Sequence, residues 1–345
     1  MKYLKKLAGK DLTGKTCLLR VDFNLKSPKD IFRIKAILPT LKFLLEKNTK
    51  VLILSHRGRP KGADKNLSLE QMAETLSGEI GKKVIFLRSF DFNGIKMYLK
   101  LVEPGTIFLL ENLRFLKEEE ENDSALAKKL ASLGDFYVND AFAVSHRANT
   151  SVAAITKYLP SYAGLLMEQE IKNLSLAFRP KKPLVVILGG SKITDKIGII
   201  RNLSKQAKYF LLGSSALNLS SREVKPYLKM KKVVLPVDSA KSGNNHLDIG
   251  PKTINEYRKL IKGAKTIIWN GPVGFNEKKR YAIGSASIAR MIINSGAFTI
   301  VGGGETTNFL VGLNLDKKIK FLSTGGGAML EFLAGKKLPG IKALK

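Results

Sequence analysis

The sequence predicts an α/β protein of two doubly wound, Rossmann-like domains, each a parallel sheet with helices on both faces. Short apolar runs alternate with amphipathic stretches along the chain, which is typical of a parallel sheet covered by helices. The alternation begins again after one long amphipathic stretch near the middle. The length of 345 residues is sufficient for two hydrophobic cores.

In the first half of the chain, predicted strands and helices take turns. We expect strands at residues 17–21, 51–54, 107–110 and 136–138, and helices at residues 33–45, 68–80 and 124–133. The acidic run at residues 118–121 is expected to open the last helix on a solvated face, because carboxylates are favourable near the positive end of a helix dipole.

The second half repeats this pattern. We expect strands at residues 184–188, 209–212, 233–235, 266–269, 298–301 and 320–322, and helices at residues 197–204 and 328–333. An amphipathic helix at residues 161–179 is predicted to join the two domains, and Arg179-Pro180 stops it. The domains are therefore predicted at residues 1–160 and 180–334.

The net charge of +30 does not by itself indicate a nucleic-acid-binding protein. Residues 1–170 have a net charge of +8, and residues 171–345 have one of +22. Lysine outnumbers arginine by 46 to 13, whereas base recognition favours arginine. No nucleic-acid-binding motif accompanies the charge. We therefore predict a solvated, lysine-rich surface and no specific nucleic-acid partner.

No segment predicts export or insertion into a membrane. Lysines and Asp11 interrupt the N-terminal region before a signal peptide can form, and the apolar runs are shorter than the ~18 residues of a membrane helix. The only cysteine, Cys17, lies in an apolar strand, which favours a buried thiol. We expect a cytoplasmic protein without a membrane partner.

Polar and basic side chains follow most strands of the first half, at the carboxyl ends where open α/β sheets bind ligands. These residues are Asp22, Asn24, His56, Arg57, Arg59, Arg114, His146 and Arg147, and Arg33 begins the first helix nearby. Several arginines at one sheet edge suit a small substrate that carries carboxylate or phosphate groups. Asp22 and Asn24 suit the hydroxyl groups of such a substrate.

Glycine-rich turns follow three strands of the second half. They are Gly189-Gly190-Ser191-Lys192, Gly302-Gly303-Gly304-Glu305 and Gly325-Gly326-Gly327. A strand, a glycine turn and a helix N-terminus together form a phosphate site, because bare backbone N–H groups face the anion. Lys192 and Lys196 are four residues apart and are expected on one helical face. Glu305 is the natural carboxylate for a phosphate-bound Mg²⁺.

The two clusters indicate direct phosphoryl transfer between a small anion and a nucleotide, which needs positioning and charge neutralisation. The G-x-x-x-x-G-K-[ST] loop and the G-x-G-x-x-G motif are both missing, which argues against a P-loop hydrolase and a nicotinamide oxidoreductase. No Ser-His-Asp or Cys-His arrangement offers a protein nucleophile.

Eight motifs, in the same order, resemble the signatures of the phosphoglycerate kinase family over almost the whole chain. They are Arg20-Val-Asp-Phe-Asn24, Ser55-His-Arg-Gly-Arg-Pro60, Glu111-Asn-Leu-Arg-Phe115, Val138-Asn-Asp-Ala-Phe142, Gly189-Gly-Ser-Lys-Ile-Thr-Asp-Lys196, Leu247-Asp-Ile-Gly-Pro251, Trp269-Asn-Gly-Pro272 and Ser323-Thr-Gly-Gly-Gly-Ala328. The resemblance implies reversible transfer of the acyl phosphate of 1,3-bisphosphoglycerate to Mg-ADP, giving 3-phosphoglycerate and ATP in glycolysis without a covalent enzyme intermediate.

The same resemblance implies an architecture. Two domains are expected to close across a cleft by a hinge movement, which excludes water from the acyl phosphate. The C-terminal segment, residues 335–345, is expected to pack back on the first domain. We expect a monomer that requires Mg²⁺ and uses ADP or ATP as a substrate.

The resemblance also implies roles for individual residues. Those expected to bind the glycerate substrate are Asp22, Asn24, Arg33, His56, Arg59, Arg114 and Arg147. Those expected to assist the transfer are Arg33, Lys192, Gly325, Gly326 and Gly327. Those expected to bind the nucleotide are Gly190, Ser191, Lys192, Lys196, Gly213, Leu247, Asn270, Pro272, Glu277, Gly304, Glu305 and Thr306, with Glu305 as the metal ligand.

The chain departs from the family pattern mainly on the nucleotide side. The metal position is usually Asp and here is Glu305, and the turn beside the adenine pocket is Gly213-Ser-Ser-Ala216 rather than glycine-rich. The segments after Asn218 and after Asp238 are short, and Asn149 stands where a second His is usual. We therefore expect an altered nucleotide preference. The alternative is a catalytically weakened relative that binds nucleotides or polyanions.

Overall fold

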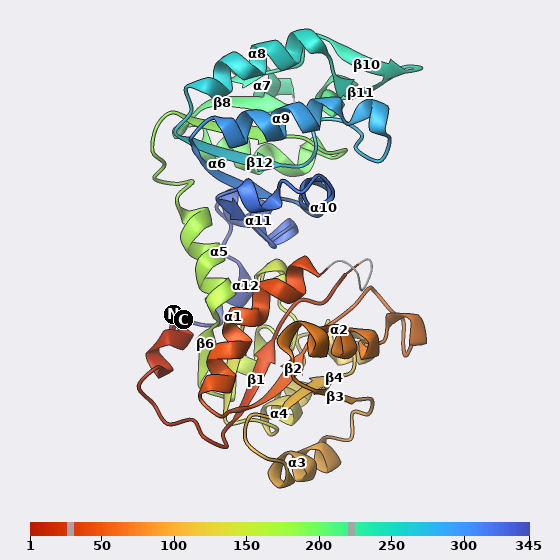
Figure 1. Ribbon diagram of the computed structural model, residues 1–345, viewed down its shortest axis with the longest axis vertical. Helices are drawn as coiled ribbons and strands as arrows, with labels where there is room; N and C mark the ends of the chain where they lie inside the picture. The colour runs from red at the N-terminus through yellow and green to blue at the C-terminus, as the bar shows by residue number, and fades with distance from the viewer. Residues whose placement is uncertain (26–30, 220–224) are drawn as a thin grey trace. The chain divides into compact units, whose positions relative to one another are not determined.

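Two parallel sheets, one in each half of the chain, organise the described part of the protein. The computed structural model describes residues 1–25, 31–219 and 225–345. It divides into a first unit, Met1–Glu170 with Lys337–Lys345, and a second unit, Ile171–Lys336. Each unit has its own sheet and its own helices (Figure 1). The predicted fold class, two doubly wound parallel-sheet domains, is confirmed.

The sheet of the first unit has six parallel strands in the order β3-β4-β2-β1-β5-β6. Its strands are β1 (Thr16–Arg20), β2 (Lys50–Leu54), β3 (Val84–Leu87), β4 (Ile107–Leu110), β5 (Phe136–Asn139) and β6 (Ser161–Ala163). Its helices are α1 (Phe32–Glu46), α2 (Glu70–Ile80), α3 (Phe92–Leu101), α4 (Ser124–Ala131) and α12 (Pro339–Lys342). Because β1 lies between β2 and β5, the direction of winding reverses at β1.

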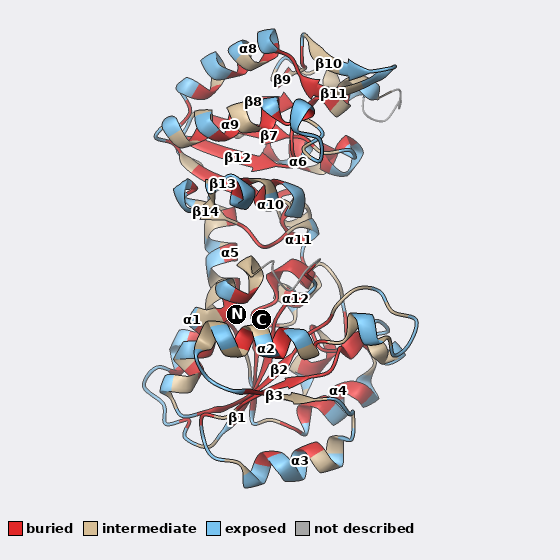
Figure 2. Cartoon of the chain, turned by 45° about the vertical axis from the view of Figure 1, so that its right-hand side comes forward, coloured by how far each residue is buried: buried red, intermediate tan, exposed pale blue. Residues whose placement is uncertain are grey.

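Alternate side chains of these strands face opposite sides of the sheet. Leu19 of β1 belongs to a core cluster with Ile37 of α1 and Met72 of α2. In β4, the ring of Phe108 packs against Tyr98 of α3, with ring centroids 5.6 Å apart. Figure 2 shows the strands largely buried, while the helices have both buried and exposed residues. The sheet is therefore a buried support for the loops at its strand ends.

The sheet of the second unit also has six parallel strands, in the order β14-β13-β12-β7-β8-β9. Its strands are β7 (Leu184–Leu188), β8 (Ala207–Leu212), β9 (Val233–Val234), β12 (Thr266–Asn270), β13 (Phe298–Gly302) and β14 (Phe321–Leu322). Its helices are α6 (Ile197–Leu203), α7 (Lys225–Leu228), α8 (Pro251–Lys262), α9 (Ile283–Asn294), α10 (Gly304–Gly312) and α11 (Gly327–Leu333). An antiparallel hairpin adds β10 (Ser239–Ser242) and β11 (Asn245–Ile249).

The core of the second unit is built in the same way. Ile187 of β7 and Trp269 of β12 share a buried cluster with Tyr257 of α8 and Ile288 of α9. The hydroxyl of Tyr257 donates to the carbonyl oxygen of Leu212 at 2.7 Å, so the buried polar atom is satisfied. Helices α6 and α11 pack against each other.

The helix predicted at residues 161–179 is shorter in the structure. Residues Ser161–Ala163 form β6, which pairs with β5, and helix α5 spans Leu165–Ser175. The first residues complete the sheet edge, so the helix cannot begin until the strand has ended. Its N-terminus is anchored by two side chains of the first unit. Leu165 N–H donates to Thr40 Oγ1 at 2.9 Å, and Met167 N–H donates to Asp140 Oδ1 at 2.9 Å.

Residues 337–345 also belong to the first unit. The N–H of Gly340 donates to the carbonyl oxygen of Ser145 at 2.9 Å, and Leu338 and Leu344 are buried. A Cβ on Gly340 would lie within 2.9 Å of both Val152 and Ser145, so a glycine allows this close approach. Within the described residues, no helix is long and apolar enough to cross a membrane.

Asp140 generates a prediction about stability and pH. Burial raises the pKa of its carboxyl group from 3.8 to about 6, against the effect of its hydrogen bonds. The folded state therefore binds a proton more tightly than the unfolded state, so this contribution to stability is lost as the pH rises through 6. The unfolding free energy of the wild type should fall between about pH 4 and about pH 8. In the non-ionisable Asp140→Asn variant, this fall should be smaller by about 2 kcal/mol.

Urea unfolding followed by circular dichroism measures this difference. The chain has one tryptophan, Trp269, so its fluorescence reports the second unit separately. Asp248 is the matched control, because burial in the second unit also raises its pKa to about 6. Asp248→Asn should change the pH dependence of the Trp269 transition, and Asp140→Asn should not. Identical pH dependence in wild type and Asp140→Asn would contradict the prediction.

Candidate functional site

The carboxyl ends of β1 and β5 are neighbours where the winding of the first sheet reverses, the usual ligand position in such sheets. Asp22, just after β1, accepts hydrogen bonds from Arg33 Nη1 and from the N–H of Asn24, both at 2.8 Å. His56 follows β2, and its Nε2 lies 3.9 Å from Asp22 Oδ1. The structure thus brings these four predicted substrate residues together.

The charge of Asp22 is held by this environment. Burial alone raises the pKa of its carboxyl group. The charges of Arg33 and Arg20 and the N–H of Asn24 outweigh burial, so the pKa lies below 3.8. Asp22 is therefore ionised at neutral pH and provides one negative charge among several cations.

The loop after β2 is held by Asn112, which the sequence analysis did not single out. This buried amide accepts from the N–H of Arg57 at 3.1 Å and donates to the carbonyl oxygen of Arg57 at 2.8 Å. The next residue, Gly58, donates its N–H to Asn24 Oδ1 at 2.9 Å. Gly58 has a φ of +66°, and a Cβ there would lie 2.8 Å from Leu67. The loop therefore requires glycine.

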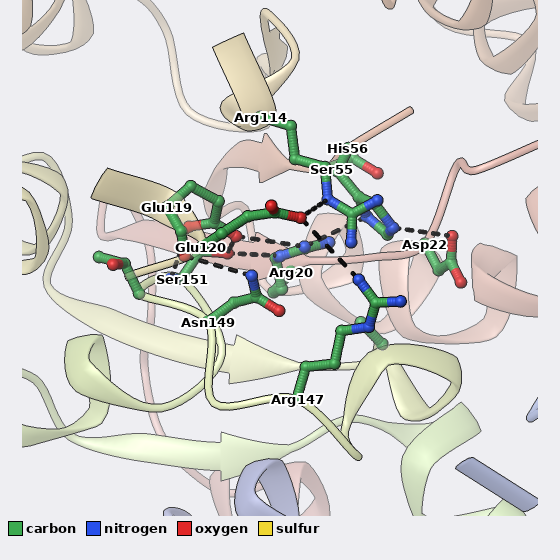
Figure 3. Close-up of polar contacts among 12 residues, drawn as sticks. Arg20, Asp22, Ser55, His56, Arg114, Glu119, Glu120, Arg147, Asn149 and Ser151 are labelled. Atoms are coloured by element: carbon green, nitrogen blue, oxygen red, sulfur yellow. Dashed lines mark hydrogen bonds and ion pairs between the residues drawn. The ribbon is translucent and has the colours of Figure 1, made fainter. Parts of the chain in front are cut away.

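Two predicted arginines converge on Glu120, as Figure 3 shows. Arg114 Nε lies 3.3 Å from Glu120 Oε1, and Arg147 Nη1 lies 3.9 Å from the same oxygen. Arg114 also donates from Nη1 to the carbonyl oxygen of Gly58 at 2.5 Å. Burial, together with the charge of Arg147, lowers the pKa of Arg114 from its ordinary value. Arg59 is exposed in the loop after β2.

The prediction for the acidic run at residues 118–121 is wrong. Residues Lys117–Glu119 form a short 3-10 turn, η4, and α4 begins later because Asp123 is its N-cap. The Asp123 carboxylate accepts from the N–H of Leu126 at 2.6 Å, which satisfies one orphan donor of the helix. The run therefore precedes the helix, and Glu119 is buried rather than solvated.

Glu119 belongs to a buried network around Arg20, another residue that the sequence analysis did not assign to the site. Arg20 Nη2 lies 3.6 Å from Glu119 Oε1, and both side chains are 1% exposed. Ser151 Oγ donates to Glu119 Oε1 at 2.6 Å. Asn149 Nδ2 donates to the carbonyl oxygen of Glu119 at 3.2 Å. The sequence feature that could have indicated this network is Arg20 itself, a charged residue at the end of an apolar strand.

In the second unit, the winding reverses between β7 and β12. Gly189 N–H donates to the carbonyl oxygen of Asn270 at 3.0 Å, and Gly190 N–H donates to that of Pro272 at 2.6 Å. A Cβ on Gly189 would lie 2.0 Å from the Pro272 oxygen, so only glycine permits this contact between the two loops. Three predicted nucleotide residues, Gly190, Asn270 and Pro272, therefore lie together.

The turn after β8 joins the same group. A Cβ on Gly213 would lie 3.1 Å from the Cα of Gly189, so these backbones are in close contact. Ser215, in the turn that the family fills with glycine, donates from Oγ to the carbonyl oxygen of Gly190 at 2.7 Å. The serine therefore braces the loop after β7.

The expectation that Lys192 and Lys196 share a helical face is wrong. Lys192 is exposed at the N-cap of a 3-10 turn, η7 (Ile193–Lys196), and α6 begins only after it. Lys196 is buried, and its Nζ donates to the carbonyl oxygen of Lys192 at 3.4 Å. Burial lowers the pKa of Lys196, while the charges of Asp195 and Glu305 raise it. Because a 3-10 turn is tighter than an α-helix, Lys192 is exposed to solvent while Lys196 is buried.

Helix α10 begins directly after the turn that follows β13, with Gly304 as its first residue. Glu305 is exposed in the first turn. Behind it, the hydroxyl oxygens of Thr306 and Thr307 are buried and have no hydrogen-bond partner in the described structure. The carboxylate and hydroxyl oxygens offer ligands for a cation that is bound to phosphate. The two hydroxyl groups can also donate hydrogen bonds to the phosphate oxygens.

These residues fit Mg²⁺ that arrives with phosphates. Magnesium is usually held by one or two carboxylates together with substrate phosphates, and Glu305 offers one. Across residues 1–25, 31–219 and 225–345, no group of three or more His, Cys, Asp or Glu side chains forms a metal site. A cage made only of protein side chains is therefore not seen in that part of the chain.

The third glycine turn, at residues 325–327, lies between β14 and α11. The N–H of Gly325 donates to Ser323 Oγ at 3.0 Å, and Gly326 has a φ of +48°. Gly327 is the first residue of α11 and is exposed. The turn thus places bare backbone at a helix start, as predicted.

Leu247 and Glu277 lie on a different feature of the second unit. Leu247 is in β11, and its carbonyl oxygen accepts from the N–H of Phe275 at 2.7 Å. Glu277 follows in that loop and is exposed, as is Ser191 after β7. No described hydrogen bond or ion pair joins Leu247 or Glu277 to the glycine turns.

Comparison with known protein families distinguishes between the functions considered for these two clusters of residues. The family model described as phosphoglycerate kinase matches residues 7–219 and 217–336. The chain belongs to the phosphoglycerate kinase family. A phosphoglycerate kinase of Dictyoglomus turgidum is 39% identical, with 98% of each chain covered. One of Thermosipho africanus is 41% identical, with 97% of this chain and 96% of the relative covered.

Solved structures of phosphoglycerate kinases share the fold. That of Pyrococcus horikoshii OT3 has a TM-score of 0.88 and 30% identity, and covers 100% of this chain and 98% of its own. That of Coxiella burnetii has a TM-score of 0.81 and 34% identity, with 98% of both chains covered. The family resemblance found in the eight motifs is confirmed.

The chain is shorter than its phosphoglycerate kinase relatives. The alignment with the Dictyoglomus turgidum protein spans 386 positions, whereas this chain has 345 residues, so the relative contains segments that this chain lacks. The predicted shortening after Asn218 falls partly on residues 220–224, which lie outside the described residues. The positions of the two shortened segments, after Asn218 and after Asp238, therefore stay predictions.

Arg114 generates a prediction about anion binding. Its buried guanidinium is fixed beside Arg147, so replacing it with methionine removes a preorganised cation. A hydrogen bond to a charged group contributes about 1.5–3 kcal/mol, so Arg114→Met should weaken the binding of 3-phosphoglycerate about 10- to 100-fold. Calorimetric titration measures the dissociation constant.

Arg88→Met is the matched control, because Arg88 is exposed in the same unit and pairs with Glu70 instead. It should bind 3-phosphoglycerate as the wild type does. Equal affinity in Arg114→Met and Arg88→Met would show that the Arg114 guanidinium does not face the ligand.

Proposed function

We propose that this member of the phosphoglycerate kinase family transfers the acyl phosphate of 1,3-bisphosphoglycerate to ADP and forms 3-phosphoglycerate and ATP. A terminal oxygen of ADP attacks the acyl phosphorus, the bond from phosphorus to the carboxyl oxygen breaks, and a carboxylate leaves. The observation that carries the proposal is the pair of anion-suited clusters within one chain of this family. One lies where the first sheet reverses, and the other where the second sheet reverses.

In the first unit, we assign binding of the glycerate substrate to Asp22, Asn24, Arg33, His56, Arg59, Arg114 and Arg147. The arginines neutralise the phosphate and carboxylate charges, because a planar guanidinium matches both groups. The ionised Asp22 keeps Arg33 in place through the 2.8 Å contact and can accept from a substrate hydroxyl.

In the second unit, the nucleotide phosphates are assigned to the glycine turns and to Lys192 and Lys196. The remaining assigned residues are Ser191, Gly213, Leu247, Asn270, Pro272, Glu277, Gly304 and Thr306. Backbone N–H groups at Gly325–Gly327 and the charges of Arg33 and Lys192 are assigned to the transferring phosphoryl group. Such preorganised donors stabilise charge without reorganisation during the reaction.

Glu305, with the hydroxyl of Thr306 beside it, is assigned to Mg²⁺ bound with the nucleotide. The metal supplies charge neutralisation between the phosphates when it is bound. The Glu305 carboxylate would offer one oxygen ligand to this metal. The side chain is one methylene longer than the Asp usual in the family.

Direct transfer requires the two substrates to meet, so we propose that the units close by a hinge movement during turnover. The domain predicted at residues 1–160, with residues 335–345, is assigned to the glycerate substrate. Residues 180–334 are assigned to the nucleotide, with residues 161–179 as the connection. We further propose a cytoplasmic monomer that acts on small molecules, with no specific nucleic-acid or membrane partner. The polyanion-binding alternative gains no support from the family or the fold.

Lys192 generates the test of this assignment. It is exposed, at the start of a turn beside the assigned phosphates. Losing one preorganised charge at the transferring group costs on the order of 10²–10³ in turnover, so Lys192→Ala should lose that factor in ATP formation. A coupled assay with 1,3-bisphosphoglycerate and ADP measures it. Lys205→Ala, an exposed lysine of the same unit, should retain the wild-type rate.

If Lys192→Ala kept the wild-type turnover, the role of Lys192 would be wrong. If the wild type formed no ATP, the proposed function itself would fail. Running the assay with GDP beside ADP tests the expected change of nucleotide preference.

Glu305 generates a separate prediction about the metal. Glu305→Ala should raise the Mg²⁺ concentration needed for the half-maximal rate about tenfold or more, because a charged oxygen ligand is lost. Glu305→Asp should stay within a few-fold of the wild type. Initial rates at fixed ADP and varied free Mg²⁺ make the comparison. An unchanged Mg²⁺ requirement in Glu305→Ala would remove Glu305 from the metal site.

A further inference from the structure

Arg20 lies inside the first unit beneath the assigned glycerate site. Its side chain is 1% exposed. Nε donates to Ser151 Oγ at 2.7 Å, and Nη1 donates to the carbonyl oxygen of Val21. Nη2 lies 3.2 Å from His56 Nδ1 and 3.6 Å from Glu119 Oε1 (Figure 3). Each of its three nitrogen atoms therefore has a protein partner, and none faces solvent.

The contact with His56 determines which imidazole nitrogen carries the proton. A guanidinium only donates hydrogen bonds, so Nδ1 of His56 must be the acceptor. A neutral ring with a bare Nδ1 carries its proton on Nε2. A doubly protonated ring would place its Nδ1–H against an Arg20 N–H, so the arrangement also disfavours the imidazolium.

The proton on Nε2 has no acceptor within the described residues. His56 is 1% exposed, and its Nε2 makes no hydrogen bond. The 3.9 Å separation from Asp22 Oδ1 is too long for one. A buried donor without an acceptor is costly unless a ligand provides one. Asp22 is itself an assigned substrate residue, so this donor lies beside the glycerate site.

We propose that Arg20 is a positioning residue that holds His56 as the neutral Nε2–H tautomer, so that Nε2–H donates to an oxygen of the anionic substrate. The proposal rests on the proposed function only for the identity of that substrate. Arg20 acts through His56 and does not contact the substrate itself.

The surroundings of His56 keep the ring neutral. Burial lowers its pKa well below 6.5. Asp22 after β1 opposes this effect, while Arg20 in β1, Arg114 in the 3-10 turn η3 (Leu113–Phe115) and Arg33 in α1 reinforce it. The ring is therefore a neutral donor across the neutral pH range, and only the tautomer decides which nitrogen donates.

Glu119 and Ser151 hold the guanidinium in this orientation. Ser151 Oγ accepts a hydrogen bond from Arg20 Nε and donates one to Glu119 Oε1 at 2.6 Å. Ser151 N–H donates to Glu119 Oε2 at 3.0 Å, so the carboxylate is fixed at both oxygens. With Nε and Nη1 also engaged, Nη2 is aimed at His56 Nδ1.

Nitrogen NMR tests the tautomer directly. The chain has only three histidines, so ¹⁵N-histidine labelling gives a spectrum of three rings, and a His56→Gln variant assigns the signal. We expect the wild-type protein to show His56 with a proton on Nε2 and a bare Nδ1. In Arg20→Met, which has no donor, the signal should shift toward a mixture of tautomers. Arg20→Lys, which keeps a charged donor, should restore the Nε2–H form. A wild-type signal with the proton on Nδ1, or a tautomer unchanged in Arg20→Met, overturns the proposal.

Kinetics as a function of pH provides an independent readout. At about pH 8, Arg20→Met should raise the KM for 3-phosphoglycerate about tenfold while kcat changes less, because one donor to an anion is misplaced. As the pH falls, protonation of His56 supplies a donor at Nε2 whatever the tautomer. The ratio of variant KM to wild-type KM should then approach one. If Arg20→Met only perturbed the structure, the ratio of the two KM values would not depend on pH. A ratio that does not change with pH therefore contradicts the proposal.

Two controls separate positioning from folding. Arg20→Met leaves Glu119 buried without its partner, so Arg20→Met combined with Glu119→Gln removes both charges and should fold if the single variant does not. The double variant should show the same tautomer change. Arg88→Met, on the exposed surface of the same unit, should leave the tautomer and the KM unchanged. If the wild type lacked kinase activity, the proposed function would fail, and the tautomer measurement would still decide this inference.

Discussion

A positive charge buried at the end of an apolar strand is the constraint around which the first unit is arranged. Removing a guanidinium from water costs on the order of several kcal/mol unless each donor finds an acceptor. Arg20 finds acceptors on its own strand, on the loop after β2, in η4 and in the segment that contains Ser151. These segments share one buried charge, so they cannot shift independently. The contacts that Arg20 makes also hold His56 and Glu119 in place. Glu120, the next residue after Glu119, lies beside Arg114.

The second unit prepares for an anion by a different means. Its loops bring backbone rather than charged side chains to the switch point, and glycines allow that backbone to approach closely. The 2.6 Å contact of Gly190 N–H with the oxygen of Pro272 fixes one loop against the other. In the first unit, the proposed anion site consists of charged side chains that are held in place by other side chains. In the second unit, the proposed site consists of glycine turns and helix starts, and Lys192 and Glu305 are exposed beside them.

Much of the fold was predictable because periodic apolar patterns survive in the sequence. Helix α1 and strands β1, β2, β7 and β12 lie within a residue or two of their predicted ranges. Strand β6 and the hairpin β10–β11 were not predicted, since short edge strands carry little periodicity. The linking helix was predicted too long because β6 takes its first residues.

The site was predictable at the level of residue types and less so at the level of contacts. Asp22 and His56 follow strands and Arg33 begins the first helix, and the strand ends meet at one sheet edge, so the proximity of these residues followed from the topology. The burial of Glu119 did not follow, because a run of glutamates resembles a solvated surface until its partner Arg20 is placed. The inward turn of Lys196 depends on a 3-10 turn, which the spacing of lysines does not reveal. Tertiary pairing, rather than local pattern, decided each of these cases.

The packing of residues 337–345 against the first unit has a consequence for the order in which the protein is made. The second unit is one continuous segment, Ile171–Lys336, and it is synthesised completely before those residues leave the ribosome. The first unit begins earlier and yet lacks the buried Leu338 and Leu344 until then. The first unit therefore cannot complete its core until the whole of the second unit has been synthesised, although most of its own residues precede that unit in the chain.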